Sequence, residues 1–102
     1  MGTIIKVASK KDLPPSKAIS VSAGSKQIAV FNIEGKFYAI DDSCTHAGGS
    51  LSEGQCQGTV VTCPWHGATF DVTTGAVLSE PAADNVGSYK VVVEGEDVKI
   101  EV

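Results

Sequence analysis

The chain has 102 residues, of which 42% are apolar and 20% charged, a composition that predicts one folded domain of modest size. Its formal charge of −4 argues against nucleic acid as a partner, because phosphate binding requires a basic face. The sequence contains neither the run of roughly eighteen apolar residues that a membrane span requires nor a charged and then apolar leader pattern, so we expect a cytoplasmic protein without membrane attachment.

Apolar residues recur at every second position in short runs separated by glycine, which predicts an all-β fold. The segment Asp12-Leu13-Pro14-Pro15 is expected to be a loop, because proline cannot join a central ladder. Glu34-Gly35 is expected to reverse the chain in a hairpin. The expected strands cover residues 3–8, 17–22, 26–33, 36–40, 59–62, 68–72, 76–79, 88–94 and 97–102.

Two short segments each contain one cysteine and one histidine, Cys44 with His46 and Cys63 with His66. Thiolate and imidazole bind both iron and zinc, so the ligand types alone leave the metal open. A zinc finger normally takes its cysteines from one end and its histidines from the other. The mixed order here favours a two-iron cluster clamped between two loops, with the cysteines on one iron and the histidines on the other. A structural zinc site built from the same four residues is the alternative.

The segments Cys44-Thr45-His46 and Cys63-Pro64-Trp65-His66-Gly67 resemble the signature of the Rieske iron–sulfur family. The resemblance is close over residues 37–75 and loose in the flanking strands. It implies stacked antiparallel sheets in a single domain, residues 1–102, with a small cluster-binding subdomain at about 41–81 formed by the two ligand loops. It also implies one Rieske-type 2Fe-2S cluster, held by Cys44, His46, Cys63 and His66.

The chain departs from the respiratory-chain members of that family. In those proteins the positions matching Gly49 and Trp65 are cysteines joined in a disulfide. This chain lacks both cysteines, and in this respect it resembles the oxygenase-associated ferredoxins. Cys56 is then left as a packing or surface residue, which suits a reducing compartment. High-potential members carry serine and tyrosine where this chain has Ala68 and Phe70. The resemblance therefore implies a low reduction potential, because hydroxyl groups that hydrogen-bond cluster or cysteine sulfur are missing.

The histidine count limits the chemistry of the chain. Rieske oxygenases hold a second, mononuclear iron with two histidines and a carboxylate, whereas this chain has two histidines in total and both are assigned to the cluster. It also lacks a glycine-rich phosphate loop for a nicotinamide or flavin. We therefore expect an electron-transfer component of a multicomponent oxidoreductase system rather than an enzyme by itself.

The resemblance implies a ferredoxin that passes single electrons from an NAD(P)H-dependent reductase to a terminal oxygenase, either a ring-hydroxylating dioxygenase or a related monooxygenase. Partners are expected to dock transiently near His46, Trp65 and His66. The small Rieske-like subunit of an assimilatory nitrite reductase is the alternative, and a zinc-stabilised interaction module is a weaker one. Five carboxylates are expected either to gather at the cluster end or to be ordinary solvated groups: Asp41, Asp42, Glu53, Glu80 and Asp84.

Overall fold

The computed structural model describes residues 3–15, 17–23, 26–42, 50–64, 67–79 and 85–101, which are almost entirely β-structure, as predicted. The strands are β1 (Ile4–Ser9), β2 (Ala18–Ala23), β3 (Lys26–Ile33), β4 (Lys36–Asp41), β5 (Gln55–Gln57), β6 (Val60–Thr62), β7 (Thr69–Asp71), β8 (Val77–Ser79), β9 (Ser88–Glu94) and β10 (Asp97–Glu101). Two short 3-10 helices are η1 (Lys10–Asp12) and η2 (Leu51–Glu53). Neither of these described helices has the length and apolar character that crossing a membrane demands.

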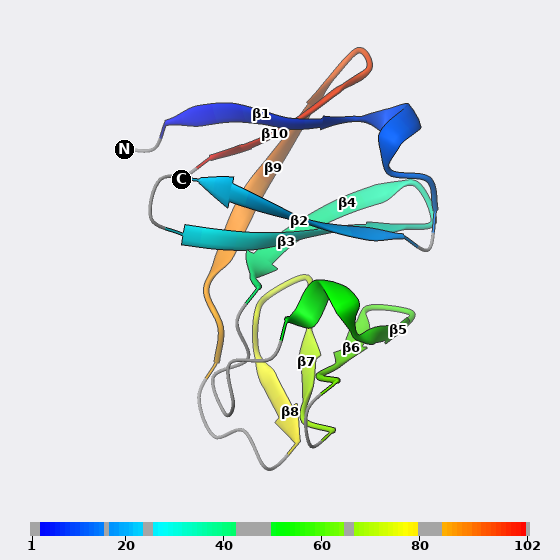
Figure 1. Ribbon diagram of the computed structural model, residues 1–102, viewed down its shortest axis with the longest axis vertical. Helices are drawn as coiled ribbons and strands as arrows, with labels where there is room; N and C mark the ends of the chain where they lie inside the picture. The colour runs from blue at the N-terminus through cyan, green and yellow to red at the C-terminus, as the bar shows by residue number, and fades with distance from the viewer. Residues whose placement is uncertain are drawn as a thin grey trace.

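The strands form two antiparallel sheets that stack along the long axis of the molecule (Figure 1). Within the described residues, the large sheet has the order β1-β10-β9-β4-β3-β2 and the small sheet the order β5-β6-β7-β8. β4 pairs directly with β9, through Ala39 with Tyr89 and Ile40 with Ser88. The small sheet is therefore an excursion of the chain between two neighbouring strands of the large sheet. This arrangement confirms the predicted stacked antiparallel sheets.

The hairpin predicted at Glu34-Gly35 is present and connects β3 to β4. Both residues have positive φ, 54° and 89°, as a tight two-residue hairpin turn requires. The side chain of Asn32 supports the turn, because its Oδ1 accepts a hydrogen bond of 2.9 Å from the Gly35 amide. A second predicted hairpin joins β9 to β10 through a turn in which Gly95 has a φ of 60°.

Two elements differ from the sequence-based expectation. Asp12 was expected in a loop but lies in η1, and the next residue, Leu13, is fully buried. The Leu13 carbonyl accepts a hydrogen bond of 2.7 Å from the Asn32 side chain, which holds this segment against the large sheet. β5 was not expected, because its exposed residues lack apolar alternation. It forms by pairing with β6, with Cys56 opposite Val61.

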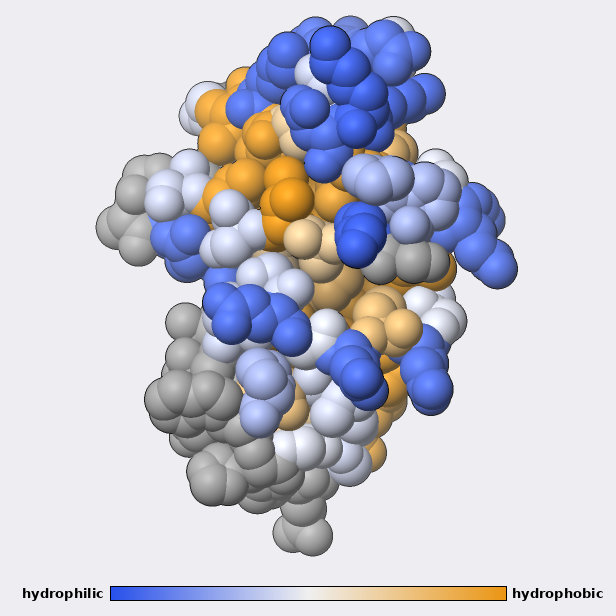
Figure 2. All heavy atoms as spheres, turned by 45° about the vertical axis from the view of Figure 1, so that its right-hand side comes forward, coloured by the Kyte–Doolittle hydropathy of each residue, from blue (hydrophilic) through white to orange (hydrophobic). Residues whose placement is uncertain are grey.

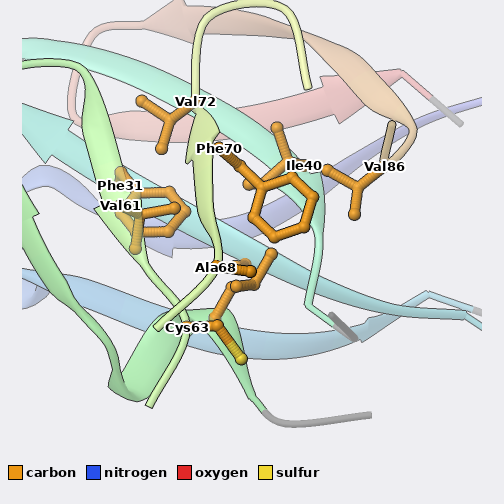
Figure 3. Packing of buried hydrophobic residues seen from close by; sticks show 10 residues of the cluster. Phe31, Ile40, Val61, Cys63, Ala68, Phe70, Val72 and Val86 are labelled. Atoms are coloured by element: carbon orange, nitrogen blue, oxygen red, sulfur yellow. The ribbon is translucent and has the colours of Figure 1, made fainter. Parts of the chain in front are cut away.

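Buried side chains form two clusters on opposite faces of β3. Alternate residues of that strand enter different clusters, Ile28 and Val30 on one face and Ala29 and Phe31 on the other, so β3 is covered on both sides. The first cluster, which we call the inter-sheet core, joins the two sheets (Figure 3). It contains Ala29, Phe31, Ile40, Leu51, Val61, Cys63, Ala68, Phe70, Val72 and Val86. The second contains Leu13, Ile28, Val30, Ala39, Val98 and Ile100.

One glycine beside the small sheet is required by close backbone packing. A Cβ atom at Gly54 would lie 2.0 Å from the carbonyl oxygen of Thr62, so the backbone would have to move to admit a side chain. Gly58, by contrast, has open space around its Cβ position, although its φ is +60°. We predict that Gly54→Ala lowers the free energy of unfolding by about 2–4 kcal/mol and Gly58→Ala by about 1 kcal/mol. Thermal melting compares them, and equal melting temperatures would contradict the packing described at Gly54.

Candidate metal centre

The second predicted ligand loop lies at the tip of the hairpin formed by β6 and β7. Val61 pairs with Phe70 and Thr62 with Thr69 in that hairpin. Beyond the paired residues, the Cys63 amide donates a hydrogen bond of 2.7 Å to the Ala68 carbonyl. This bond closes the loop at its base. The loop chain therefore leaves and rejoins the small sheet at a fixed separation.

Cys63 is the one predicted ligand among the described residues, and it is 1% exposed. It lies at one end of the inter-sheet core beside Ala68, with Val72 at the far end of the cluster (Figure 3). Pro64 and Gly67 of the same loop are exposed, so the chain turns outward directly after Cys63. A buried sulfur next to an exposed residue of the loop suits a ligand that faces the protein side of a metal cluster.

The first predicted ligand loop is held at its base by Asp42, which is 4% exposed. The Asp42 carbonyl accepts a hydrogen bond of 2.7 Å from the Leu51 amide. The Asp42 carboxylate accepts two further hydrogen bonds, from the Ser52 amide at 2.8 Å and from the Ser50 hydroxyl at 2.6 Å. These bonds join the residue before the loop to the residues after it. The chain between them carries Cys44 and His46.

Asp42 also connects this loop to the large sheet. The hydroxyl of Ser20, on β2, donates a hydrogen bond of 2.8 Å to the same carboxylate. Burial alone would raise the pKa of the Asp42 carboxyl, but the hydrogen bonds from Ser50, Ser52 and Ser20 outweigh it and hold the pKa below its usual value. The expectation of an ordinary solvated carboxylate is therefore wrong for Asp42, whereas Glu53 is exposed as that expectation requires.

The neighbouring residue, Asp41, fixes the point where the chain returns from the small sheet. The Asp41 amide donates a hydrogen bond of 2.9 Å to the Gly87 carbonyl, and the Gly87 amide donates one of 2.8 Å to the Asp41 carboxylate. The hydroxyl of Tyr89 donates a further hydrogen bond to that carboxylate. Burial, together with the adjacent Asp41 carboxylate, raises the pKa of Tyr89 to about 12, so the hydroxyl stays protonated. The segment that leaves the large sheet is thus hydrogen-bonded at Asp42, and the segment that returns to it is hydrogen-bonded at the adjacent residue, Asp41.

The remaining predicted site residues fall in different places. Cys44, His46, Trp65, His66, Gly49, Glu80 and Asp84 lie outside the described residues, so the four-ligand set stays a prediction. Cys56 is exposed on β5, and its Sγ donates a hydrogen bond of 3.5 Å to the Gly58 carbonyl. Desolvation raises the pKa of the Cys56 thiol, which disfavours the reactive thiolate form. This agrees with the expectation that Cys56 is a packing or surface residue.

Comparison with known proteins identifies the family of the chain. A family described as Rieske [2Fe-2S] domain matches residues 3–90. The chain belongs to the Rieske family. Membership implies one Rieske-type 2Fe-2S cluster, and the thiolate and imidazole groups predicted in the two loops are the donors that such a cluster takes. The zinc alternative is therefore not supported for this Rieske protein.

Similar Rieske proteins carry more specific descriptions. The chain is 40% identical over 100 residues to the biphenyl dioxygenase ferredoxin subunit of Pseudomonas sp. (strain KKS102), covering 97% of this chain and 92% of that protein. A ferredoxin solved with the oxygenase of carbazole 1,9a-dioxygenase has a TM-score of 0.91 at 36% identity, covering 96% of this chain and 92% of its own. A chain described as a nitrite reductase small subunit from Mycobacterium tuberculosis has a TM-score of 0.88 at 19% identity, with coverages of 100% and 96%, which shows the fold alone.

The network around Asp42 is a feature that the sequence did not predict, and its loss has a measurable consequence. We predict that Asp42→Ala lowers the free energy of unfolding by about 2–4 kcal/mol, because the partner groups lose a charged acceptor in a buried position. Asp12→Ala is the matched control, since Asp12 is an exposed aspartate on η1. Chemical denaturation of the holoprotein measures both variants. Equal stability of the two would show that Asp42 does not hold the loop.

Proposed function

We propose that this Rieske protein is the ferredoxin of an oxygenase system, receiving single electrons from an NAD(P)H-dependent reductase and delivering them to a terminal oxygenase. The terminal oxygenase would be a ring-hydroxylating dioxygenase or a related monooxygenase. The observation that carries the proposal is the 40% identity to the biphenyl dioxygenase ferredoxin subunit, which extends over 97% of this chain. The ferredoxin solved with an oxygenase supports it, because the likeness there covers 96% of this chain.

In this proposal Cys44 and Cys63 hold the inner iron of the cluster, and His46 and His66 hold the outer iron. When bound, the cluster accepts and releases one electron. The burial of Cys63 supports its place on the inner iron. The closed bases of the two loops, at Asp42 and at Cys63 with Ala68, supply fixed supports for the ligands between them. Fixed ligand loops keep structural rearrangement small when the charge of the site changes.

Partners are proposed to dock transiently near His46, Trp65 and His66, where the outer iron would come closest to the surface. The large sheet lies at the opposite end of the molecule from β8 (Figure 1). The inter-sheet core fills the space between the two sheets with apolar side chains and keeps water away from Cys63 on that side. The carrier would therefore exchange electrons through one end only.

The proposed domain organisation is a single Rieske domain over residues 1–102, with a cluster-binding subdomain at about 41–81. It is supported by the small sheet, whose strands run from Gln55 to Ser79 and whose two connections to the large sheet are fastened at Asp41 and Asp42. The chain carries electrons and leaves the oxygen chemistry to its partner. A cytoplasmic location is part of the proposal, because assigning Cys44 and Cys63 to the cluster leaves Cys56 without an intramolecular disulfide partner.

A reconstituted electron-transfer assay tests the function. The holoprotein is mixed with a limiting amount of NADH and the reductase of a biphenyl dioxygenase system, so that no NADH remains, and then with the oxidised terminal oxygenase, while its visible absorption is followed by stopped flow. We expect bleaching by the reductase and recovery of the absorption on adding the oxygenase. Failure with dioxygenase components, together with formation of a stable stoichiometric complex with the large subunit of an assimilatory nitrite reductase, would favour the alternative function.

A further inference from the structure

A cavity of about 430 Å³ lies between the two sheets, and Cys63 is not among the residues that line it. One wall comes from β2, β3 and the β3–β4 turn, and the other from η2, β5 and the β5–β6 turn. β5 and the β3–β4 turn both lie on the right-hand side of the molecule (Figure 1). When that side is turned forward, apolar surface continues through the waist between the upper and lower parts (Figure 2). Ligand pockets commonly have volumes of roughly 300–1,000 Å³, so this cavity is large enough for a small molecule.

The first wall is a part of β3 that the small sheet leaves uncovered. Ala29, Phe31 and Ile33 lie on one face of β3, because side chains alternate along a strand. Ala29 and Phe31 are buried in the inter-sheet core, whereas Ile33 packs against that core but stays partly exposed. Each strand of the small sheet has three residues, and β3 has eight. Coverage of this face therefore ends between Phe31 and Ile33, and the cavity opens there.

The second wall carries the thiol of Cys56. Cys56 pairs with Val61, which in turn pairs with Phe70, and directly paired residues lie on the same face of an antiparallel sheet. Val61 and Phe70 belong to the inter-sheet core, so Cys56 extends that row of side chains beyond the core and into the lining of the cavity. Its Sγ donates a hydrogen bond of 3.5 Å to the Gly58 carbonyl. This wall thus presents a protonated, weakly polar sulfur to the large sheet.

The two walls together suit an aromatic ring. Ala18 and Ile33 supply partly exposed apolar surface from the large sheet, and a sulfur atom makes favourable contacts with aromatic rings. An apolar cavity of about 150 Å³ is enough to hold benzene. The larger volume here therefore accommodates a molecule of two fused rings.

The charge of the lining favours an uncharged molecule. Among the described residues that line the cavity, Lys17 is the cation and Glu34 the anion, so their formal charges cancel. An ionic ligand would lose hydration without gaining a net opposite charge, which makes its burial unfavourable. The hydroxyl groups of Ser52 and Thr59 also line the cavity and can pair with a hydroxyl group on the ligand.

We propose that this cavity binds an uncharged aromatic molecule of one or two rings, held between Ile33 of the large sheet and Cys56 of the small sheet. The inference goes beyond the proposed function and does not rest on it, because neither a cluster ligand nor a redox partner takes part in the binding. A molecule in this position contacts both sheets at once. Its binding therefore stabilises the packing of the small sheet on the large one.

Titration with 2-naphthol tests the site. The probe is added at pH 7 to the oxidised, nitrogen-15-labelled holoprotein, and amide chemical shifts are followed. We expect saturable shift changes at Ile33, Gly54 and Cys56, a dissociation constant of about 1 mM or lower, and no change at Gly95 in the distant β9–β10 turn. The melting temperature of the holoprotein should rise with the concentration of the probe. Shift changes that do not saturate, or that are as large at Gly95, would overturn the inference.

A matched pair of variants places the ring inside the cavity. Cys56→Phe and Gln57→Phe add the same phenyl group at neighbouring exposed positions of β5, but successive side chains point to opposite faces of the sheet. Cys56→Phe fills the cavity, so we expect it to weaken 2-naphthol binding by about tenfold or more, and Gln57→Phe to change it by less than about twofold. Equal effects of the two variants would contradict the proposed site.

Protection of the Cys56 thiol gives a readout that needs no substitution. N-ethylmaleimide is added to the holoprotein, and mass spectrometry follows the adduct on the peptide that contains Cys56. With 2-naphthol at ten times its dissociation constant, we expect alkylation to slow by roughly fivefold or more, because the bound ring covers the sulfur in most molecules. An unchanged rate at that concentration would overturn the inference.

A charged probe of the same shape tests the chemical class of the ligand. We expect 2-naphthoate, which is an anion at pH 7, to bind several-fold more weakly than 2-naphthol. Tighter binding of 2-naphthoate would contradict the assignment of an uncharged ligand. The visible spectrum recorded after each titration reports the cluster, so a protein without a 2Fe-2S cluster, which would refute the proposed function, is distinguished from a protein whose cavity fails to bind.

Discussion

Replacing Cys63 by serine is expected to abolish the 2Fe-2S cluster. A serine hydroxyl is a poor replacement for a thiolate ligand to iron, and the cluster crosslinks two loops of a small protein. We therefore expect colourless or nearly colourless protein, with iron content close to zero and a melting temperature at least about 10 °C below that of the wild type. Iron and acid-labile sulfide analysis, visible absorption and thermal melting measure the effect.

The chain supplies its own control for this experiment. Cys56→Ser makes the same chemical change at an exposed position of β5, away from the inter-sheet core. We expect that variant to keep its cluster and its melting temperature. Retained iron in the Cys63 variant, or equal loss of iron in both variants, would contradict the assignment of Cys63 as a ligand.

Restoring a hydroxyl group near Cys63 is expected to raise the reduction potential. Ala68 and Phe70 are fully buried in the same cluster as Cys63, and both lack the hydroxyl of the high-potential proteins (Figure 3). A hydrogen bond to sulfur stabilises the more negative, reduced state. We expect a wild-type potential near the low end of the Rieske range, about −150 mV. Ala68→Ser and Phe70→Tyr should each raise it by up to roughly 60–130 mV, from about 1.5–3 kcal/mol per charged hydrogen bond.

A buried hydroxyl placed elsewhere separates hydrogen bonding from a general change in polarity. Val72 is 1% exposed and lies at the end of the inter-sheet core away from Cys63 (Figure 3). Val72→Thr should leave the potential nearly unchanged. Protein-film voltammetry measures all four proteins. A wild-type potential well above zero, or no rise in either cluster-bearing hydroxyl variant, would show that these missing hydroxyls do not set the potential.

Local sequence patterns predicted the features that depend on local chemistry. Glu34-Gly35 predicted a hairpin, and both residues have the positive φ that the turn needs. The two Cys–His segments predicted the metal centre and the family, because ligand type and spacing are fixed by coordination chemistry. Of the four predicted ligands the structure describes Cys63, which is buried, and the ligand role of all four residues stays a prediction.

Features that depend on distant residues could not be predicted in the same way. Asp42 looks like a surface carboxylate in the sequence, but it is buried, and one of the hydroxyls that donate to its carboxylate belongs to Ser20 on a different strand. Asp41 likewise binds Gly87 and Tyr89 across two neighbouring strands. β5 exists only because β6 supplies a pairing edge. Each of these contacts joins residues that are far apart in the sequence or lack a periodic signal.

The electron paramagnetic resonance spectrum of the purified and dithionite-reduced protein tests the central claim most directly. If Cys44, Cys63, His46 and His66 hold a 2Fe-2S cluster, reduction gives a rhombic signal with the low average g value of mixed cysteine and histidine ligation. Iron analysis of the same sample then gives two irons per chain, the content of one such cluster. A colourless protein with stoichiometric zinc and no signal after reduction would contradict the account.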